Sequence, residues 1–412
     1  MNILILGGRA EAKDANSICI NNMVHEFLSR GHKVWTVVSG NENSNCKMLL
    51  NGCWQIQVKR SRFFDLSDKL KANYNLINKL LLALLTIIRH ILLMPFYPNV
   101  APFTAYKMAR LAEKLVRDNI IDCVIGTYGS YECIKTAIHI KKHCNISVVL
   151  YYLDLCTASD NKSAIIRRYA EYSTFKALVR HSKVVDLILI PLSGFKTINK
   201  LKNLNKDVIK YVGFPVYLPN SEEHNCCPLP FDKQRIAIVY IGSLSLQNRN
   251  PEYIIHLLEV INNDYGVKLS VHFWGLITDN RILSMIEASP IAEYHGFIEN
   301  KYTGYIMKNS DYILNIGNAT SVDMLPSKIF SIFSTGKPVI NVVNNTNDLS
   351  ASYFERYGNS IDIKGYAQDE KSDVANLVNS FLKGHISHYA IKEGLFKEYT
   401  PSYICDVILE TK

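Results

Sequence analysis

Two successive series of apolar runs and amphipathic segments, separated by a proline-rich stretch, most constrain how this chain can fold. The first series has a strand-like run at 3–6, helical spacing of apolar residues over 20–28 and a second strand-like run at 34–38. Such a strand–loop–helix–strand unit is typical of a parallel sheet. Residues 213–235 hold several prolines and no amphipathic period, which indicates a linker, and a second α/β series begins at Ile236.

Composition is that of an ordinary globular protein. The chain has 412 residues, 48% of them hydrophobic and 20% charged, which is enough for two domains with separate cores. Its first residues lack the basic segment and cleavage site of a signal peptide and fit a first strand better. The ten cysteines include no Cys-x-x-Cys pair and no Cys/His cluster with zinc spacing. We therefore expect reduced thiols, a cytoplasmic location, no metal site and no cofactor.

Charge is unevenly spread along the chain. Residues 1–210 hold 30 Lys and Arg against 15 Asp and Glu, a net +15, whereas residues 211–412 hold 16 against 22, a net −6. A basic first half favours an anionic partner. No basic run is interleaved with aromatic residues as in a nucleic-acid-binding module, so we expect no nucleic acid and favour an anionic membrane surface.

The segment 324–340 indicates a loop, a helix, a stop and a strand. Pro326 suits the first helical turn, where its missing N–H would be unpaired in any case, and Gly336 suits a left-handed cap. A helix entered through Pro326, Ser327 and Lys328 directs free N–H groups, a hydroxyl and an ammonium at one point. This arrangement favours an anion, most naturally a phosphate.

The run Pro-Ser-Lys-Ile-Phe followed by Thr-Gly-Lys-Pro-Val-Ile resembles the donor-binding helix of GT-B glycosyltransferases, most closely those of the retaining family 4. The resemblance implies an α/β fold, GT-B, with two Rossmann-like domains facing a cleft and a nucleoside diphosphate sugar as donor. It implies an acceptor-binding domain over 1–212, the linker 213–235, a donor-binding domain over 236–398 and a final helix, 399–412, that crosses back to the first domain. The alternative for the motif is an ordinary helix–strand unit of any α/β protein.

Cations and helix ends must meet the diphosphate charge, because the chain contains no Asp-x-Asp motif for a metal. By resemblance, Gly242 is the family glycine after a strand, and Arg249 is the second diphosphate cation. The alternative for Arg249 is a solvated loop arginine. Ser243 stands where the family places its first cation, and Lys328 is the expected substitute.

Family 4 members also carry a Glu-x7-Glu pair, whose positions correspond here to Asp323 and Ser331. Asp323 keeps a carboxylate near the expected sugar and is a candidate catalytic residue, or it is simply a polar loop residue. Ser331 is a candidate donor contact that can hydrogen-bond a ribose hydroxyl, but it cannot make the bidentate contact of a carboxylate.

Glycines at expected strand ends mark further candidate donor contacts. Gly317 and Asn318 follow a strand at the end where ligands bind in open α/β sheets. The resemblance places Gly296 in a loop that contacts the base. Gly7 and Gly8 follow the opening strand and are expected to approach the phosphate, although the Gly-x-Gly-x-x-Gly dinucleotide pattern is absent.

Asp154 ends the strand-like run 150–155. The resemblance places it at the cleft, where it could orient the acceptor hydroxyl or take its proton, so it is the second candidate catalytic residue. A helix cap is the alternative. The basic residues that follow form either a solvated face or a patch for a diphosphate-linked lipid or anionic headgroups: Arg167, Arg168, Lys176, Arg180 and Lys183.

Residues 80–94 form an apolar run that contains Arg89 and His90. The run is shorter than the ~20 residues that cross a bilayer. We predict that it lies in the membrane interface, with a helix buried between domain elements as the alternative.

These patterns together predict a glycosyltransferase that is peripheral at the inner face of the cell membrane. It would move a sugar from a nucleoside diphosphate donor to a glycan or polyprenyl-diphosphate-linked acceptor in bacterial surface polysaccharide synthesis, without a metal and with retention. One alternative is a nucleotide-sugar 2-epimerase with the same fold. The other is a GT-B-like binding protein without activity.

Overall fold

The computed structural model divides the chain into two compact units. The first comprises Met1–Val216 and Glu398–Lys412, and the second comprises Tyr217–Lys397. The structure describes residues 1–9, 15–40, 43, 47–48, 52–60, 66–67, 69–70, 75–93, 96–98, 101–119, 121–153, 164–218, 229–320, 325–382 and 394–410.

The first unit is built on a parallel sheet with an antiparallel edge. Among the described residues the strand order is β3-β4-β2-β1-β5-β6-β7-β8, and β3 pairs antiparallel with β4. The strands are β1 (Asn2–Arg9), β2 (Lys33–Gly40), β3 (Lys47–Met48), β4 (Trp54–Lys59), β5 (Cys123–Thr127), β6 (Ser147–Tyr151), β7 (Leu187–Pro191) and β8 (Ile209–Val212). The strand order reverses between β1 and β5, because β2 and β5 lie on opposite sides of β1.

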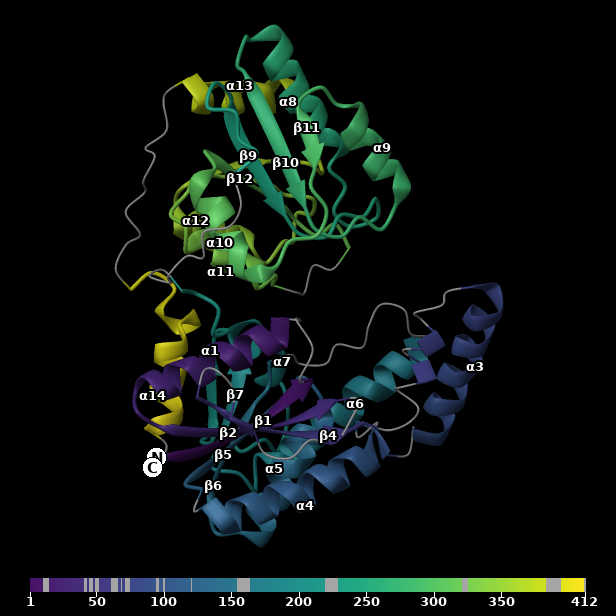
Figure 1. Ribbon diagram of the computed structural model, residues 1–412, viewed down its shortest axis with the longest axis vertical. Helices are drawn as coiled ribbons and strands as arrows, with labels where there is room; N and C mark the ends of the chain where they lie inside the picture. The colour runs from purple at the N-terminus through teal and green to yellow at the C-terminus, as the bar shows by residue number, and fades with distance from the viewer. Residues whose placement is uncertain are drawn as a thin grey trace. The chain divides into compact units, whose positions relative to one another are not determined.

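Helices cover both faces of this sheet. The described α-helices of this unit are α1 (Ala15–Ser29), α3 (Leu76–Leu93), α4 (Pro102–Asn119), α5 (Tyr131–His143), α6 (Ala164–His181), α7 (Phe195–Ile198) and α14 (Pro401–Leu409), of which α3 does not cover the sheet. Figure 1 shows α4 and α5 on one side and α1 and α14 on the other. Helix α5 follows its local sequence, since an extended Ser130 precedes it, Glu132 lies in its first turn and Lys141 and Lys142 lie in its last. These charges match the helix dipole.

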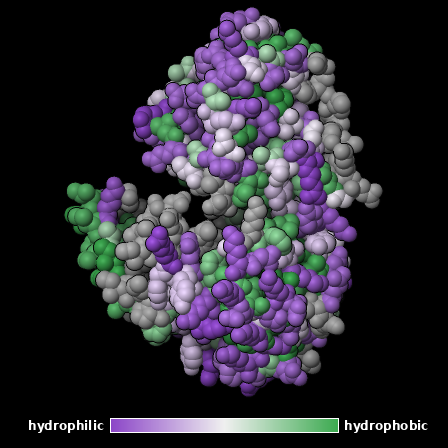
Figure 2. Space-filling view, turned by 180° about the vertical axis from the view of Figure 1, so that it is seen from behind, coloured by the Kyte–Doolittle hydropathy of each residue, from purple (hydrophilic) through white to green (hydrophobic). Residues whose placement is uncertain are grey.

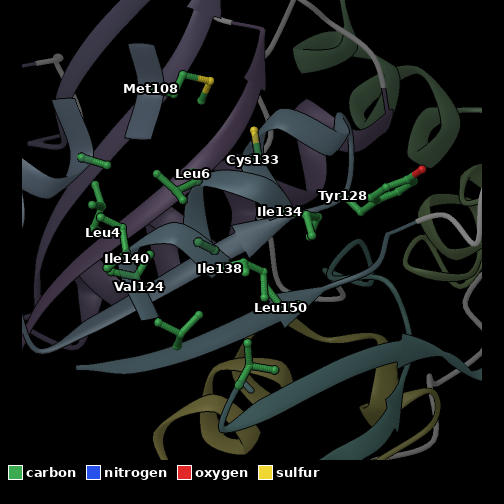
Figure 3. Close-up of a cluster of buried hydrophobic side chains, with 14 of the residues drawn as sticks. Leu4, Leu6, Met108, Val124, Tyr128, Cys133, Ile134, Ile138, Ile140 and Leu150 are labelled. Carbon is green, nitrogen blue, oxygen red and sulfur yellow. The ribbon is translucent and has the colours of Figure 1, made fainter. Parts of the chain in front are cut away.

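Alternation of side chains across the strands builds the core of the first unit. Leu4 and Leu6 of β1 point to one face, where they pack with Val124 of β5, Leu150 of β6 and Ile134 of α5. Figure 3 shows these side chains gathered between the strands and α5. Because both faces of a parallel sheet are covered, its strands are almost continuously apolar, as β5 is.

Helix α14 packs against α1 within the first unit. Thr400 caps it by accepting a hydrogen bond from the Tyr403 backbone N–H at 3.2 Å. Arg30 at the end of α1 pairs with Asp406 at 2.6 Å. The segment before α14 lies close to Gly213, where an added β-carbon would lie 2.3 Å from the Tyr399 ring. The end of the chain is therefore an integral part of the first unit.

The second unit is built on a smaller, wholly parallel sheet. Its described strands run in the order β11-β10-β9-β12-β13-β14, so the order reverses between β9 and β12. The strands are β9 (Ile236–Ile241), β10 (Leu269–Trp274), β11 (Ala292–Tyr294), β12 (Tyr312–Ile316), β13 (Val339–Val342) and β14 (Ser360–Ile363). The helices are α8 (Glu252–Asp264), α9 (Asn280–Ala288), α10 (Asn300–Asn309), α11 (Lys328–Phe333), α12 (Ala351–Tyr357) and α13 (Glu370–Leu382).

Helix α3 contains most of the apolar run 80–94 and is not buried among the described residues of its unit. Its large apolar side chains are exposed, to 75% at Leu76, 67% at Leu80 and 54% at Leu84. Figure 1 shows α3 projecting from the body of the first unit, and Figure 2 shows apolar residues gathered on that projection. Among the described residues, α3 is therefore exposed and is not covered by other elements of its unit. None of the described helices is both long and apolar enough to cross a membrane.

Replacing Gly213 with alanine tests the packing of the chain end. The new β-carbon would meet the Glu398 carbonyl oxygen at 2.6 Å as well as the buried Tyr399 ring, so Gly213→Ala is expected to lower the free energy of unfolding by roughly 1–3 kcal/mol. Urea denaturation measures this change. In the matched control Gly304→Ala, nothing lies within 4 Å of the new atom, so stability should be unchanged or slightly higher. Equal stabilities of the two variants would contradict the packing.

Candidate functional site

The carboxyl ends of β9 and β12 meet where the strand order of the second sheet reverses. Ligands of open α/β sheets bind in the crevice outside such a point. Gly242 follows β9 directly and Gly317 follows β12. Gly242 and Gly317, which are far apart in the sequence, therefore lie at the same edge of this sheet.

The Lys328 side chain reaches the loop after β9. Its Nζ lies 4.7 Å from the centre of the Tyr240 ring, which is a cation–π contact. A β-carbon on Gly242 would lie 3.2 Å from the same Nζ and 3.0 Å from the Tyr240 hydroxyl. Tyr240 is buried, and its hydroxyl donates a hydrogen bond to the Ser243 carbonyl at 2.9 Å. A glycine at 242 thus leaves room for the ammonium beside the backbone.

The ammonium of Lys328 is poorly solvated. Removal from water lowers the pKa of Lys328 well below 10.5, and the neighbouring Arg249 guanidinium lowers the pKa further. Burial raises the pKa of Tyr240 to about 12, so the ring beneath the ammonium stays neutral at physiological pH. A nearby anion would reverse the effect on Lys328 by favouring its charged form.

Arg249 is held by uncharged groups. Its Nε donates to Oδ1 of Asn318 at 2.8 Å, and its Nη1 donates to Oγ of Ser243 at 3.3 Å. Asn248 joins the same two loops, since its Nδ2 donates to Oδ1 of Asn318 and its Oδ1 accepts from the Thr320 backbone N–H. The loop after β9 and the loop after β12 therefore form one hydrogen-bonded assembly around the guanidinium.

Two cations lie close together at this site, and no described carboxylate neutralises them. Within the described residues, neither Arg249 nor Lys328 forms an ion pair. Placing two partly buried positive charges together is unfavourable unless an anion compensates for them. The arrangement is suited to a ligand with more than one negative charge, such as a diphosphate.

Packing and backbone conformation explain why glycine is needed at Gly317 and Gly296. A β-carbon on Gly317 would lie 2.8 Å from Oδ2 of Asp348, and its carbonyl accepts a hydrogen bond from Asn344 at 2.9 Å. Gly296 has a φ of 77°, and its carbonyl accepts from the Gly275 backbone N–H at 2.8 Å. Both glycines are therefore required by the fold, whether or not they contact a ligand.

The helix after Pro326 starts later than predicted. Helix α11 begins at Lys328, and Pro326 lies in the turn before it, where its carbonyl accepts from the Ile329 backbone N–H. Helix α11 has only six residues and so contributes little helix dipole. Binding of an anion would therefore depend mainly on the cationic side chains. Ser327 directly precedes the helix and makes no capping hydrogen bond, while Ser331 is exposed on its outer face.

The opening strand of the first unit is longer than predicted. Strand β1 extends to Arg9 and includes Gly7 and Gly8, with a shift of register against β2 between Leu6 and Arg9. The prediction that the two glycines follow the strand is therefore wrong. They lie at the carboxyl end of β1, where the strand order of the first sheet reverses, and a bulge of this kind redirects the chain.

A group of aromatic residues that the sequence does not predict lies at the ends of β5 and β6. The rings of Tyr128 and Tyr152 stack with centres 5.2 Å apart. The buried His181 bonds through Nε2 to the Tyr131 hydroxyl at 3.2 Å and through Nδ1 to the Tyr152 hydroxyl at 3.0 Å. Burial lowers the pKa of His181 to about 3, so the ring is a neutral support. The sequence signal for this group was a tyrosine directly after each of two apolar strands, Tyr128 after β5 and Tyr152 after β6.

The two candidate catalytic carboxylates, Asp154 and Asp323, lie outside the described residues. Each is preceded or followed closely by residues that are placed. Leu153 is buried after β6, and Leu325 is buried before α11. Their roles stay predictions.

Solved structures of low sequence identity resemble the whole chain. HepE of Anabaena, solved in complex with UDP and glucose, has a TM-score of 0.55 at 12% identity and covers 100% of this chain and 97% of HepE. UDP-GlcNAc 2-epimerase of Methanocaldococcus jannaschii has a TM-score of 0.59 at 10% identity, with 100% of both chains covered. WaaG, a glycosyltransferase involved in lipopolysaccharide biosynthesis, has a TM-score of 0.59 at 12% identity, with 99% of both chains covered.

No protein-family model and no curated protein matches the chain by sequence. The structural likenesses show the α/β fold of the GT-B type, with two Rossmann-like domains. At these identities the likeness is one of fold, and it is shared by transferases and an epimerase.

Removal of the buried ammonium should stabilise the unliganded protein. Because the folded-state pKa of Lys328 lies below that of the unfolded chain, the unfolded state binds more protons between the two values. The ammonium of Lys328 therefore destabilises the folded protein fully below the folded-state pKa, and this destabilisation fades as pH rises toward 10.5. We expect Lys328→Met to raise the free energy of unfolding at neutral pH by roughly 1–2 kcal/mol.

Urea denaturation at several pH values measures this effect. The matched control is Lys301→Met, because Lys301 is half exposed and pairs with Glu299 at 3.1 Å. The control should not be stabilised. A Lys328→Met protein that is less stable than the parent at neutral pH would show that the ammonium has a compensating partner in the unliganded fold.

Proposed function

We propose that this protein, whose fold is GT-B, transfers a sugar from a nucleoside diphosphate donor to a glycan acceptor. One observation carries the proposal: Arg249 and the poorly solvated Lys328 lie together at the reversal point of the second sheet without an ion pair among the described residues. The donor site would be in the second unit, and the acceptor would bind to the first. The complex of HepE with UDP-glucose makes UDP sugars the first donors to test.

The two cations would act on the leaving diphosphate. Negative charge grows on the diphosphate oxygen as its bond to the anomeric carbon breaks, and a preorganised ammonium and guanidinium lower the energy of that state. The diphosphate would favour the charged form of Lys328, because the opposite charge raises its pKa. The charge of the leaving group would then be met by side chains, consistent with the absence of Asp-x-Asp from the sequence.

The remaining predicted residues have subordinate roles in this proposal. Asn318 would position Arg249, because its Oδ1 holds the guanidinium. Pro326 and Ser327 would bring the start of α11 to the donor, and Ser331 would hydrogen-bond a ribose hydroxyl. Gly242, Gly296 and Gly317 would let the backbone approach the donor, as would Gly7 and Gly8 in the first unit.

Asp154 and Asp323 would carry the chemistry at the acceptor hydroxyl and near the donor sugar. Retention of the anomeric configuration follows from the family 4 resemblance and belongs to the proposal. The fold neighbour that is an epimerase supports a second candidate, a nucleotide-sugar 2-epimerase. Product analysis separates the two reactions, since an epimerase converts the sugar nucleotide without acceptor and releases no nucleoside diphosphate.

The acceptor side is proposed to lie against a membrane. Helix α3 presents exposed apolar side chains, which can insert into the interfacial region of a bilayer. Helix α6 adds exposed charge, because Arg168, Lys176 and Arg180, which lie eight and then four residues apart, are all exposed. An apolar helix face together with basic residues suits an anionic surface that holds a lipid-linked glycan, as in bacterial surface polysaccharide synthesis.

Donor binding should depend strongly on both cations. Charge-assisted hydrogen bonds contribute roughly 1.5–3 kcal/mol each, so Lys328→Met and Arg249→Ala should each weaken UDP binding by about 10- to 100-fold. Isothermal titration calorimetry measures the affinity, and EDTA should leave it unchanged. The matched control is Arg281→Ala, since Arg281 is exposed and already pairs with Asp279 at 2.8 Å. If UDP binds equally well to all three variants, the donor-site assignment is wrong.

Membrane binding should depend on the apolar face of α3. Burying one large apolar side chain contributes roughly 1.5–3 kcal/mol, so Leu80→Glu with Leu84→Glu should reduce co-sedimentation with anionic vesicles by at least about tenfold. Leu382→Glu is the control, because Leu382 is 70% exposed but lies in the second unit. No difference between these proteins would contradict a role for α3 at the membrane.

A further inference from the structure

Three potential metal ligands share one face of the second sheet, at its β10–β11 edge. His272 of β10 is the register partner of Glu293 of β11. His295 follows two residues after Glu293 and so projects to the same side. Trp274, two residues after His272, stacks on the His295 ring with centres 4.3 Å apart and planes 20° apart. The strand register therefore brings two imidazoles and a carboxylate together.

The distances between the ligand atoms suit one small cation. Nδ1 of His272 lies 3.0 Å from Nε2 of His295, and Oε2 of Glu293 lies 3.8 Å from each of these nitrogens. Ligands bound to zinc at roughly 2.1 Å lie about 3–3.5 Å from one another. The two nitrogens already fit. The Glu293 side chain is 63% exposed and can close the remaining few tenths of an ångström by rotation.

The charges of the His272, Glu293 and His295 side chains favour a bound cation. Burial lowers the pKa of His272 to about 4, with His295 lowering it further, and burial also lowers the pKa of His295. The geometry of the rings supports metal binding, because Nδ1 of His272 faces Nε2 of His295 at 3.0 Å, so at most one proton lies between them and at least one of the two nitrogens presents a lone pair to an ion. The negative charge of the Glu293 carboxylate is not neutralised by these two rings when they are uncharged.

We propose that His272, Glu293 and His295 bind one divalent transition-metal ion of the zinc type. Two imidazoles and a carboxylate are a common ligand set for such ions, and the exposure of Glu293 leaves further positions open to water. The ion takes the place of the proton shared between the two imidazole nitrogens, and the ring that donated this proton carries it on its other nitrogen instead. One N–H bond of that ring breaks and one forms, so no proton is released and no bond between heavier atoms of the chain changes.

The site is separate from the cations proposed to hold the donor, and its effect is on the edge of the sheet. An ion held by both strands fastens β11 to β10 and fixes the start of the loop that contains Gly296. The carbonyl of Gly296 already accepts from the Gly275 backbone N–H. Metal binding should therefore stabilise this edge and this loop, and the diphosphate contacts do not require it.

Trp274 provides a direct readout of the ion. It is the sole tryptophan in the sequence of the second unit, and it lies against the ligand His295. We expect Co²⁺, added to the untagged full-length protein after chelator treatment, to quench Trp274 emission at one ion per chain. Zn²⁺ should displace the cobalt and restore the emission, and it should raise the midpoint of thermal unfolding by mass action.

Substitutions at the two accessible ligands locate the site. Glu293→Gln and His295→Ala should each weaken the cobalt affinity at least tenfold. Glu293 is exposed, so its variant is expected to fold normally, which an unchanged far-UV circular dichroism spectrum verifies. The matched control is His256→Ala, since His256 is also a histidine beside a glutamate, Glu370, at 3.2 Å. Absence of saturable quenching, or equal affinity in parent and Glu293→Gln protein, would overturn the proposal.

Discussion

The pairing of Arg249 with Lys328, which has no carboxylate partner in the described part of the chain, is the constraint around which the second unit is organised. Parallel pairing of β9 with β12 places two loops side by side, and Asn318 and Asn248 join them. The glycine at 242 and the ring of Tyr240 then admit the Lys328 ammonium next to Arg249. In the unliganded fold this pairing is unfavourable, so its presence is best explained by an anion that binds there.

The sequence predicted the residues of this site, but not the relative contributions of the helix end and the cationic side chains. Lys328 was predicted from the signal for a helix start at Pro326, and Arg249 from the resemblance to family 4 in the segment after the strand at 236–241. The expected contribution of the helix end was too large, since α11 begins at Lys328 and is short. Helix starts depend on tertiary packing, and Pro326 is compatible both with a first turn and with the turn before it. The contact of Lys328 with Tyr240 requires the fold, since the two residues are far apart in sequence.

Two other features, the His272–Glu293–His295 cluster and the exposure of α3, could not be predicted from the spacing of residues in the sequence. His272 lies on β10, whereas Glu293 lies on β11 and His295 directly follows that strand, so only the register of β10 with β11 brings His272 to the other two, and a search for short zinc motifs does not find the cluster. Hydropathy identified the apolar run in α3, but the same pattern fits a buried helix. The exposure of Leu76 and Leu80 distinguishes the two possibilities. The α/β class and the two series of strands were predictable because periodicity is a local signal.

Proton uptake on donor binding tests the central claim most directly. If the Lys328 ammonium is partly deprotonated in the free protein and is paired with a diphosphate in the complex, UDP binding must take up protons. Calorimetry in buffers of different ionisation enthalpy, from neutral to alkaline pH, measures this uptake. The account predicts uptake that grows with pH in the parent protein and is absent in Lys328→Met. Binding without proton uptake across this range, or uptake that persists in Lys328→Met, would contradict it.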